Sequence, residues 1–480
     1  MVDLNSWTGG GASKLRFGAV PGFQGASAIA TVRIESGETV ATLPERLVMS
    51  SEVARRRIPE LGTQRAAAQQ LTETALDRAA VWCLLIHERS LGTRSPWAPY
   101  ISVLPKRASI TTPTLHMDEE GVGAELAGTR LLEAVRRRER VLRDVFSFVV
   151  EPLIATDPRG VKYPVATWSR AALAWAASCF WSRAIRVSLR GVESEAMLPL
   201  LDMLNHRPGA LSTLSTRRGE VCLTDGVGFA PGEQVCLNYG ARSNADLLLN
   251  FGFVLASNGA DVVVVDESEL RDELAGIAAS RAARALQNTH LVVERVDQQR
   301  VVASAAPAAA EPPLKRVRAA ATAVAPPALR CAAAPLLLHA SSPLSSALLD
   351  RIRAIAANVT GCAPAAPPPA AAAAADDFAL WVRQFRAETE GRAGGSGDGG
   401  AAEAIVTMAR GTALATKDEA RTLAALRRLF TAMLARLAVT DAGARSDKAS
   451  VLGMIARYKR SQAELLHAAL RDLDAADAAV

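Results

Sequence analysis

The chain has 480 residues, of which 49% are hydrophobic and 22% charged, and its formal net charge is +6. This length exceeds what one hydrophobic core usually serves, so we expect two or three domains. The basic excess is mild and lies in short clusters such as Arg136–Arg140, beside acidic residues, which argues against direct nucleic-acid binding.

The six cysteines, at positions 83, 179, 222, 236, 331 and 362, lack the spacing of a metal site or a disulfide framework. We therefore expect reduced thiols, no metal and an intracellular location, with cytoplasm, chloroplast and nucleus all open. There is no apolar run of about 20 residues, so no membrane-spanning helix is expected. The first ten residues also lack the pattern of a signal peptide.

Hydrophobic periodicity divides the N-terminal half into alternating strand and helix regions. Gly37 marks a tight turn between two early strands, and Gly92 ends a helical run. In chain order the predictions are strands within 15–50, helices within 52–92 and 117–188, strand character over 195–240, and a short helix ending at Gly252.

Beyond residue 262 the chain becomes rich in alanine, proline and glycine. Such segments bury too little apolar surface to offset the entropy of ordering. They predict disordered insertions at about 303–335, 362–376 and 391–400. Helices are predicted between and after them, at 343–357, 377–390, 401–410, 417–438 and 447–475.

One apolar stretch, Met197–Gly209, contains Asp202 and then the adjacent pair Asn205 and His206. Burying such groups costs free energy unless they find partners, so this is either a strand ending in a polar turn or a strand ending in a functional site. A hydrolase would need a nucleophile, but Cys222 and Cys236 lie in apolar, strand-like settings that favour inert thiols. No sequence motif for hydride, phosphoryl or zinc-hydrolytic chemistry is present.

A second polar group follows the next predicted strand. Tyr239 is one of only four tyrosines and is followed by Gly240, after which Ser243 is a suitable N-cap for a helix. A tyrosine at a strand end with glycine behind it suggests a hydroxyl presented into a narrow space.

Three segments in this order, "LPLLDMLNH", "GEQVCLNYG" and "SNADLLLNFGF", resemble the SET domain. More narrowly they resemble the branch that includes Rubisco large-subunit lysine methyltransferase and the actin-histidine methyltransferase. The segments "LLIHERSLGTRSPWAPYISVLP" and "IARYKRSQAELLHAAL" are similar to the helical insert and the last helices of that family.

The resemblance implies an α+β protein with two domains. Residues 1–262 would form a SET-type β-fold with a pseudoknot and a helical insert at about 85–190. Residues 263–480 would form an all-α substrate-binding domain of the Rubisco-methyltransferase type, interrupted by the disordered insertions.

The resemblance also implies a site for S-adenosyl-L-methionine and a protein acceptor, without a metal. Tyr239 would lie at the point of methyl transfer and act as the catalytic residue. The other residues implied are Gln24, Gly25, Ala26, Asn205 and His206 with Tyr239 for the cofactor, and Arg183, Asp202 and Phe251 for the substrate, the first two through their carbonyls. The resemblance further implies a narrow channel through which the acceptor side chain enters. Aromatic residues in the wall of this channel, with Phe251 and Trp181 as candidates, would favour a cationic acceptor.

The cofactor loop departs from the family pattern. Relatives carry Gly-x-Gly where this chain reads Gly25-Ala26-Ser27. Ser27 stands in place of the second glycine, and serine preserves the backbone path there only if its φ is negative. A positive φ at this position would weaken the binding of the cofactor.

We therefore expect a monomeric protein-lysine N-methyltransferase that acts on a non-histone protein. Protein-histidine methylation on the same scaffold is an alternative. Lysine is favoured because Ile185, two residues after Arg183, is apolar and cannot orient an imidazole. A non-catalytic SET module that binds a protein is the third hypothesis.

Overall fold

The computed structural model describes residues 7, 13–18, 20, 27–63, 71–265, 269–270, 336–339, 352, 355, 417–438, 443 and 450–478. The predicted insertions at about 303–335, 362–376 and 391–400 lie outside these residues. So do the predicted helices at 377–390 and 401–410 and most of the one at 343–357.

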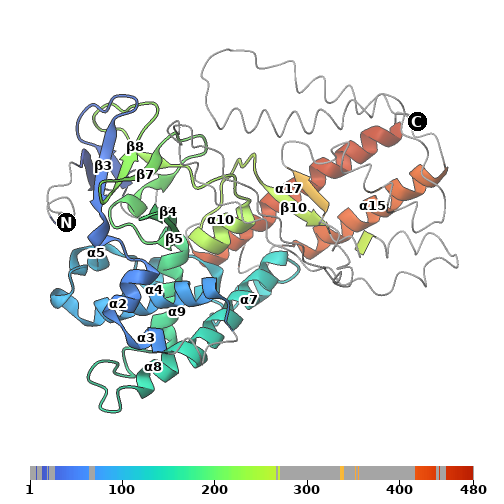
Figure 1. Ribbon diagram of the computed structural model, residues 1–480. Coiled ribbons are helices and arrows are strands. Elements are labelled where there is room, and N and C mark those ends of the chain that lie inside the picture. Colours follow the sequence, from blue (N-terminus) through green and yellow to red (C-terminus); the bar gives the residue numbers. More distant parts are fainter. Residues whose placement is uncertain are drawn as a thin grey trace, which may run out of the picture.

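Short strands form several small sheets, and those labelled in the first 240 residues lie on one side of the molecule, whereas β10 lies apart from them (Figure 1). In the largest, β8 lies between β3 and β7, with antiparallel pairing on both sides. Gly37, with a φ of 79°, makes the predicted turn before β3. The paired strands are β1 (Leu15–Gly18) with β2 (Ser27–Ala30), β3 (Thr39–Pro44) and β7 (Thr213–Arg217) with β8 (Glu220–Thr224), β4 (Ile185–Leu189) with β5 (Val192–Ala196), β6 (Asn205–His206) with β9 (Cys236–Leu237), and β10 (Val262–Val265) with β11 (Leu336–His339).

The apolar run before Asn205 is not a strand, and the predicted strand character is wrong there. β5 ends at Ala196, and the chain then turns at Leu200, whose φ is 78°, into a 3-10 helix, η7 (Leu201–Met203). The Asp202 N–H donates to the Leu198 carbonyl at 2.9 Å and closes this turn. The leucines of the run are fully buried. Burial therefore explains the apolar composition, which a compact buried turn shares with a strand.

Helices follow the first strands and fill the lower part of the view in Figure 1. Ser50, Thr72 and Ser169 accept backbone N–H bonds as N-caps of α2, α4 and α9. The α-helices are α2 (Ser51–Arg57), α3 (Glu60–Thr63), α4 (Glu73–Ser90), α5 (Ala98–Val103), α6 (Val122–Leu126), α7 (Arg130–Val145), α8 (Glu151–Ala155) and α9 (Arg170–Arg183). Shorter turns are η1 (Glu45–Leu47), η3 (Gly92–Arg94), η4 (Arg107–Ser109), η5 (Pro113–Leu115) and the π-helical η6 (Phe146–Val150).

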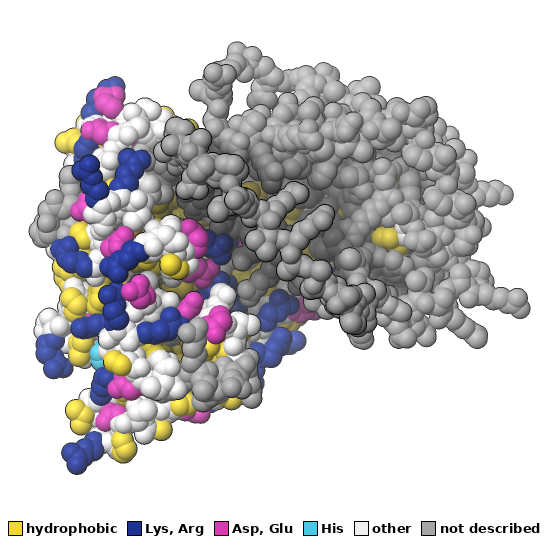
Figure 2. All heavy atoms as spheres, viewed as in Figure 1, with side chains coloured by type: hydrophobic (Ala, Val, Ile, Leu, Met, Phe, Trp, Pro, Cys, Tyr) yellow, Lys and Arg dark blue, Asp and Glu magenta, His cyan; other side chains and the backbone are white. Residues whose placement is uncertain are grey.

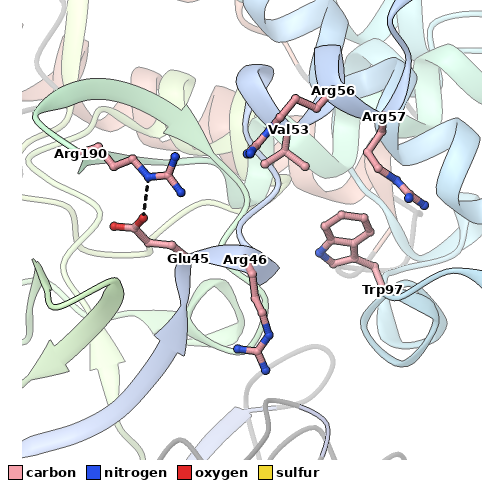
Figure 3. Close-up of a pocket in the computed structure, with 7 residues that line it drawn as sticks. All are labelled: Glu45, Arg46, Val53, Arg56, Arg57, Trp97 and Arg190. Carbon is pink, nitrogen blue, oxygen red and sulfur yellow. Dashed lines mark hydrogen bonds and ion pairs between the residues drawn. The ribbon is translucent and has the colours of Figure 1, made fainter.

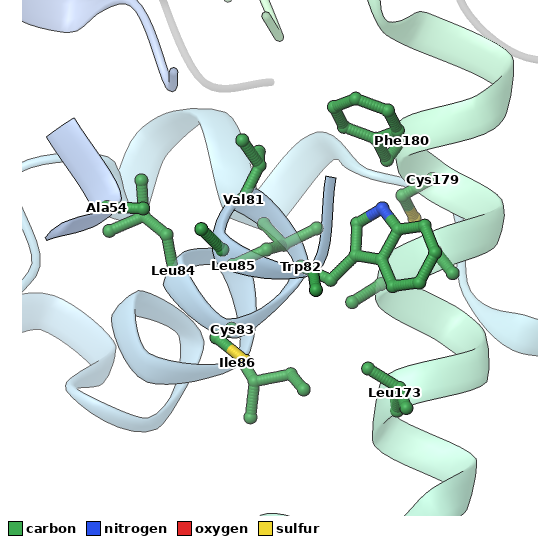
Figure 4. Close-up of a cluster of buried hydrophobic side chains, with 14 of the residues drawn as sticks. Ala54, Val81, Trp82, Cys83, Leu84, Leu85, Ile86, Leu173, Cys179 and Phe180 are labelled. Carbon is green, nitrogen blue, oxygen red and sulfur yellow. The ribbon is translucent and has the colours of Figure 1, made fainter. Parts of the chain in front are cut away.

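The core of this helical part is centred on Trp82 of α4, which packs against α9 (Figure 4). Its ring meets the ring of Phe180 edge-on at 6.3 Å and that of Trp181 at 5.3 Å between centroids. Such aromatic pairs add stability beyond the area that they bury. Because α9 ends at Arg183, this core fixes the position of that arginine.

The C-terminal helices pack against the strand-bearing part through α17. The predicted helices at 417–438 and 447–475 are confirmed as α15 (Lys417–Arg436) and α17 (Val451–Ala478). Apolar residues of α17 such as Ile455 and Tyr458 pack with α10 (Asn244–Phe251) and α6. α10 begins at the predicted N-cap Ser243 and ends at Gly252, which has a φ of 78°.

Buried polar contacts accompany this packing. Asn244 donates from Nδ2 to the Ser461 hydroxyl at 3.2 Å, and its backbone N–H donates to Asp261 at 2.8 Å. The Lys459 ammonium lies 3.6 Å from a Glu125 carboxylate oxygen, and both side chains are buried. Removing one partner of such a buried pair is strongly destabilising.

The face of the molecule seen in Figure 2 carries basic and acidic side chains interspersed across the described part of the chain. Among the described residues, no helix has the length and apolar character needed to cross a membrane.

The core contact of α4 with α9 leads to the first prediction. Trp82 is 1% exposed, and replacing a buried tryptophan by alanine costs about 3–5 kcal/mol. We expect Trp82→Ala to lower the free energy of unfolding by that amount in urea denaturation. Val161→Ala is the control, because Val161 is 83% exposed and surface changes stay within about 0.5 kcal/mol. Equal effects of the two substitutions would contradict this account of the core.

Candidate active site

Two segments that are far apart in sequence meet through a short parallel pairing of strands. Asn205 and His206 of β6 pair with Cys236 and Leu237 of β9. The next residue after the pair also takes part, because the Arg207 N–H donates to the Leu237 carbonyl at 3.0 Å. The pairing places Tyr239, two residues beyond β9, beside His206.

Two hydrogen bonds hold Tyr239 against β6. Its backbone N–H donates to Nδ1 of His206 at 3.1 Å, and its hydroxyl donates to the Leu204 carbonyl at 2.6 Å. Burial raises the pKa of the Tyr239 hydroxyl, so it stays protonated and remains a donor. Burial lowers the pKa of His206, with a smaller contribution from Arg242, which favours the neutral ring that can accept from Tyr239.

Four aromatic rings gather here, and we call them the aromatic stack. Tyr239 stacks on His206 at 5.0 Å and on Phe251 at 4.7 Å between ring centroids. Phe253 lies 6.1 Å from Phe251 and 6.3 Å from His206. The guanidinium of Arg242 sits 5.4 Å from the Phe251 ring and donates from Nε to the Tyr239 carbonyl at 2.8 Å.

The Asn205 side chain connects this group to the N-terminal strands. Its Nδ2 donates to the Ser27 hydroxyl at 2.8 Å, and Ser27 is the first residue of β2. Of the predicted cofactor loop, Gln24, Gly25 and Ala26 lie outside the described residues. Asn205 therefore contacts Ser27, the loop residue at which the described chain resumes.

Arg183 and Asp202 form a buried polar group with Tyr100 of α5. The Tyr100 hydroxyl donates to Oδ2 of Asp202, whose side chain is fully buried. Nη1 of Arg183 donates to the Asp202 carbonyl at 3.2 Å and lies 3.8 Å from Oδ1. In the described part of the chain, Nε of Arg183 and Oδ1 of Asp202 are buried and have no hydrogen-bond partner.

The burial of this group changes the proton affinity of Asp202. Desolvation raises the pKa of Asp202 to about 6, although Arg183 and the Tyr100 hydroxyl act in the opposite direction. The negative charge of Asp202 in turn favours the charged form of Arg183, and the pKa of Arg183 is raised despite its burial.

The structure brings together Asn205, His206, Tyr239 and Phe251, and in a second group Arg183 and Asp202. The sequence analysis missed Phe253, Tyr100 and Leu204. Phe253 had a signal, because it follows Phe251 by two residues in "NFGF". Trp181 is not part of the aromatic stack; it packs on Trp82 and on Arg138, whose guanidinium is 4.2 Å from its ring.

The described cysteines are free thiols, and three of them, Cys83, Cys179 and Cys236, are buried. Burial raises the pKa of Cys83 and of Cys179 to about 12, which keeps both as thiols. Within the described residues, no group of three or more His, Cys, Asp or Glu side chains is placed to hold a metal ion.

Comparison with known structures identifies the fold. Rubisco LSMT bound to sinefungin and monomethyllysine is similar with a TM-score of 0.58 and 17% identity, over 98% of this chain and 90% of that one. The SET domain of LSMT bound to lysine and AdoHcy is similar with a TM-score of 0.56. The chain therefore has the α+β SET-domain fold of the Rubisco LSMT type, as the sequence motifs predicted.

Curated relatives agree with this class. Actin-histidine N-methyltransferase of Danio rerio is 29% identical over 243 residues, which are 49% of this chain and 39% of the relative. The Drosophila melanogaster protein of the same name is 28% identical over 290 residues, 55% of this chain and 50% of the relative. The chain thus spans half or less of the length of these two relatives. No family model matches the sequence.

The raised pKa of Asp202 leads to a prediction about stability. The folded-state pKa of about 6 exceeds the ordinary value of 3.8, so the folded protein binds this proton more tightly than the unfolded chain does. The stability from this group is fully present below about pH 4 and is lost as the pH rises through about 6. A shift of about two pKa units corresponds to about 3 kcal/mol.

Asp202→Asn cannot ionise and should escape this loss. We expect its free energy of unfolding, relative to the unsubstituted protein, to rise by about 3 kcal/mol between about pH 4 and pH 7. Urea unfolding at several pH values measures the difference. Asp118→Asn, whose side chain is 79% exposed in the native protein, is the control and should show no such trend. A pH-independent difference for Asp202→Asn would refute the raised pKa.

Proposed function

We propose that this chain is an S-adenosylmethionine-dependent protein N-methyltransferase. The observation that carries the proposal is the meeting of Asn205–His206 with Tyr239 through the β6–β9 pairing. The two motifs come together in a fold shared with proteins whose structures were solved with AdoMet, AdoHcy or lysine.

The described residues fit the cofactor. The buried Nε of Arg183 has no acceptor in the described part of the chain, and a guanidinium matches a carboxylate such as the one in the methionine half of the cofactor. Asn205 reaches Ser27, at the edge of the loop proposed to hold the cofactor. We assign to cofactor binding Gln24, Gly25, Ala26, Asn205, His206 and Tyr239. The guanidinium of Arg183 would also bind the cofactor, at its carboxylate.

S-adenosylmethionine supplies, when bound, a methyl group on a sulfonium that a nitrogen lone pair can attack in line. The protein then has to align the acceptor and keep it deprotonated. The Tyr239 hydroxyl and the carbonyls of the η7 turn provide polar contacts for alignment, each of them weak. A half-buried site beside aromatic rings disfavours the ammonium form of an amine before transfer.

The acceptor that we favour is lysine. Ile185 begins β4, is partly buried and packs in the same apolar cluster as Tyr239, so it offers no hydrogen bond to an imidazole. The rings of Tyr239 and Phe251 suit an aliphatic chain that ends in a methylated cation. The proposed substrate contacts are Phe251 and the carbonyls of Asp202 and Arg183. Residues 263–480 would make the remaining contacts with the substrate, a non-histone protein.

Histidine is the second candidate acceptor, because the curated relatives are named actin-histidine N-methyltransferases. The third candidate is a SET module that binds protein without catalysis, suggested by the altered loop sequence Gly25-Ala26-Ser27. Calorimetry with S-adenosylmethionine tests this third candidate. The absence of measurable cofactor binding would favour the non-catalytic module.

The decisive experiment labels a proteome with the full chain and S-adenosylmethionine that carries a heavy methyl group. We expect the label on lysine of one or a few proteins, identified by mass spectrometry of the digested peptides. Label on histidine would replace the favoured acceptor by the second candidate. Absence of label above a reaction without enzyme, together with no cofactor binding, would overturn the proposed function.

The contacts of Tyr239 give a prediction for catalysis. Tyr239→Phe keeps the ring stack but removes the hydroxyl that donates to Leu204. Loss of alignment at the transfer point should lower kcat by about 10- to 100-fold, since small misplacements have effects of this size. Transfer is measured with the substrate found above, and cofactor affinity by calorimetry should change by less than about threefold. An unchanged kcat would remove the hydroxyl from the mechanism.

A further inference from the structure

An arginine-lined pocket lies apart from the aromatic stack, on the outer end of the β4–β5 hairpin. Its volume is about 280 Å³, and we call it the arginine pocket. Its lining comes from η1, α2, the turn of the hairpin and the segment before α5 (Figure 3). The lining residues are Glu45, Arg46, Val53, Arg56, Arg57, Trp97 and Arg190.

The charges in the arginine pocket are only partly balanced. Arg57 bonds the buried carboxylate of Glu88 at 2.8 Å and is thereby neutralised. Arg190 lies 3.3 Å from Glu45 and 3.9 Å from Glu52, and Arg56 lies 3.7 Å from the same Glu52. Among the described residues, Arg46 makes no hydrogen bond or ion pair that would balance its charge.

These ion pairs leave the guanidinium groups available. Arg46, Arg56 and Arg190 are exposed, and exposed pairs at such distances contribute little to stability. Each guanidinium has five N–H donors in a fork that matches carboxylate or phosphate oxygens. In Figure 3, Arg190 from the hairpin and Arg56 from α2 point toward each other, whereas the Arg46 side chain points away from them.

The floor of the pocket is rigid. The Trp97 ring nitrogen donates to the Leu47 carbonyl at 2.8 Å, and the tryptophan is 3% exposed. Val53 adds an apolar wall. A fixed apolar floor with a rim of guanidinium groups suits a short side chain that ends in an anionic group, since ligand sites combine apolar walls with a few placed polar or charged groups.

We propose that the arginine pocket is an exosite that binds an anionic side chain of the protein substrate, a carboxylate or a phosphorylated residue. That the bound anion belongs to a methylation substrate rests on the proposed function. The binding of anions to the pocket does not depend on methyl transfer.

The distance between the two sites limits where the anionic residue lies. Arg190 follows Arg183 by seven residues, and the intervening β4 is extended. At about 3.3 Å per residue the pocket lies at most about 23 Å from Arg183. An extended substrate segment of about seven residues covers this distance, so we place the anionic residue within about eight residues of the acceptor.

Binding to the pocket is tested with the full chain and fluorescein-labelled peptides of one length. One contains a run of glutamates, one a single phosphoserine among neutral residues, and one only glutamine in place of the glutamates. We expect the glutamate or the phosphoserine peptide to bind, more weakly at about 300 mM than at about 50 mM salt, and the glutamine peptide not to bind. The peptide that binds identifies the source of the anion.

The variant is Arg56→Gln with Arg190→Gly. Arg190 has a φ of 52°, which glycine adopts without strain, so the fold is retained and the melting temperature should not fall. The matched control is Arg33→Gln with Arg218→Gly, which removes the same charge; Arg218 also has a φ of 52° in a hairpin turn and does not line the pocket. We expect the dissociation constant to rise about tenfold in the variant and to change less than about threefold in the control.

Three results would overturn the exosite: neither anionic peptide binds, the variant binds as tightly as the unsubstituted chain, or the control loses as much affinity as the variant. In transfer assays with the substrate found by proteome labelling, the variant should raise KM about tenfold and leave kcat unchanged. If no substrate is labelled, the proposed function fails while the peptide assay still decides whether the pocket binds anions.

Discussion

The pairing of β6 with β9 is the constraint on which the rest of the site depends. Only two residues of each strand take part, Asn205 and His206 with Cys236 and Leu237. The paired backbones set the position of Tyr239, two residues after β9, relative to β6. The hydrogen bond from the Tyr239 N–H to His206 fixes the direction of the tyrosine side chain. From that position the ring contacts Phe251 at the end of α10, so one short ladder orders side chains from three separate segments.

The helical insert supports the same region from the other side. Trp82 fixes α9, whose last residue is Arg183, and Tyr100 of α5 donates to the carboxylate of Asp202 in the η7 turn. The turn therefore receives two hydrogen bonds from the insert, both at Asp202, from the Tyr100 hydroxyl and from Nη1 of Arg183, and one from Tyr239, at Leu204. Leu200, with its positive φ of 78°, lies directly before the turn. A residue in that conformation persists only where its surroundings hold it, and these bonds do so.

The sequence singled out residues that the structure brings together, but it did not predict the residues that hold them in place. Asn205, His206, Tyr239 and Phe251 each lie in a short ordered motif. The N-cap Ser243 and the helix end at Gly252 also have local signatures, and both are confirmed in the structure. Tyr100 was missed because its partner Asp202 lies 102 residues away, and nothing local specifies that contact. The strand prediction failed around Leu200 because a compact buried turn has the same apolar composition as a buried strand.

The arginine pocket was beyond sequence analysis for the same reason. Arg46, Arg56 and Arg190 lie in three different segments of the sequence, namely η1, α2 and the turn between β4 and β5. Only the antiparallel β4–β5 hairpin brings the last of them beside the first two. The cluster at Arg136–Arg140, which the sequence analysis singled out, lies instead on α7.

The contacts of α17 have a consequence for how the chain can be divided. Asn244, at the start of α10, bonds Ser461, and Lys459 is buried against Glu125 of α6. Cutting the chain after residue 262 would remove the ammonium that is buried against Glu125 and one of the hydrogen-bond partners of Asn244. It would also expose the apolar side of α10, which ends in Phe251. The C-terminal helices thus act as part of the scaffold for the first 262 residues, so a version shortened at that point would lack contacts that stabilise its own core.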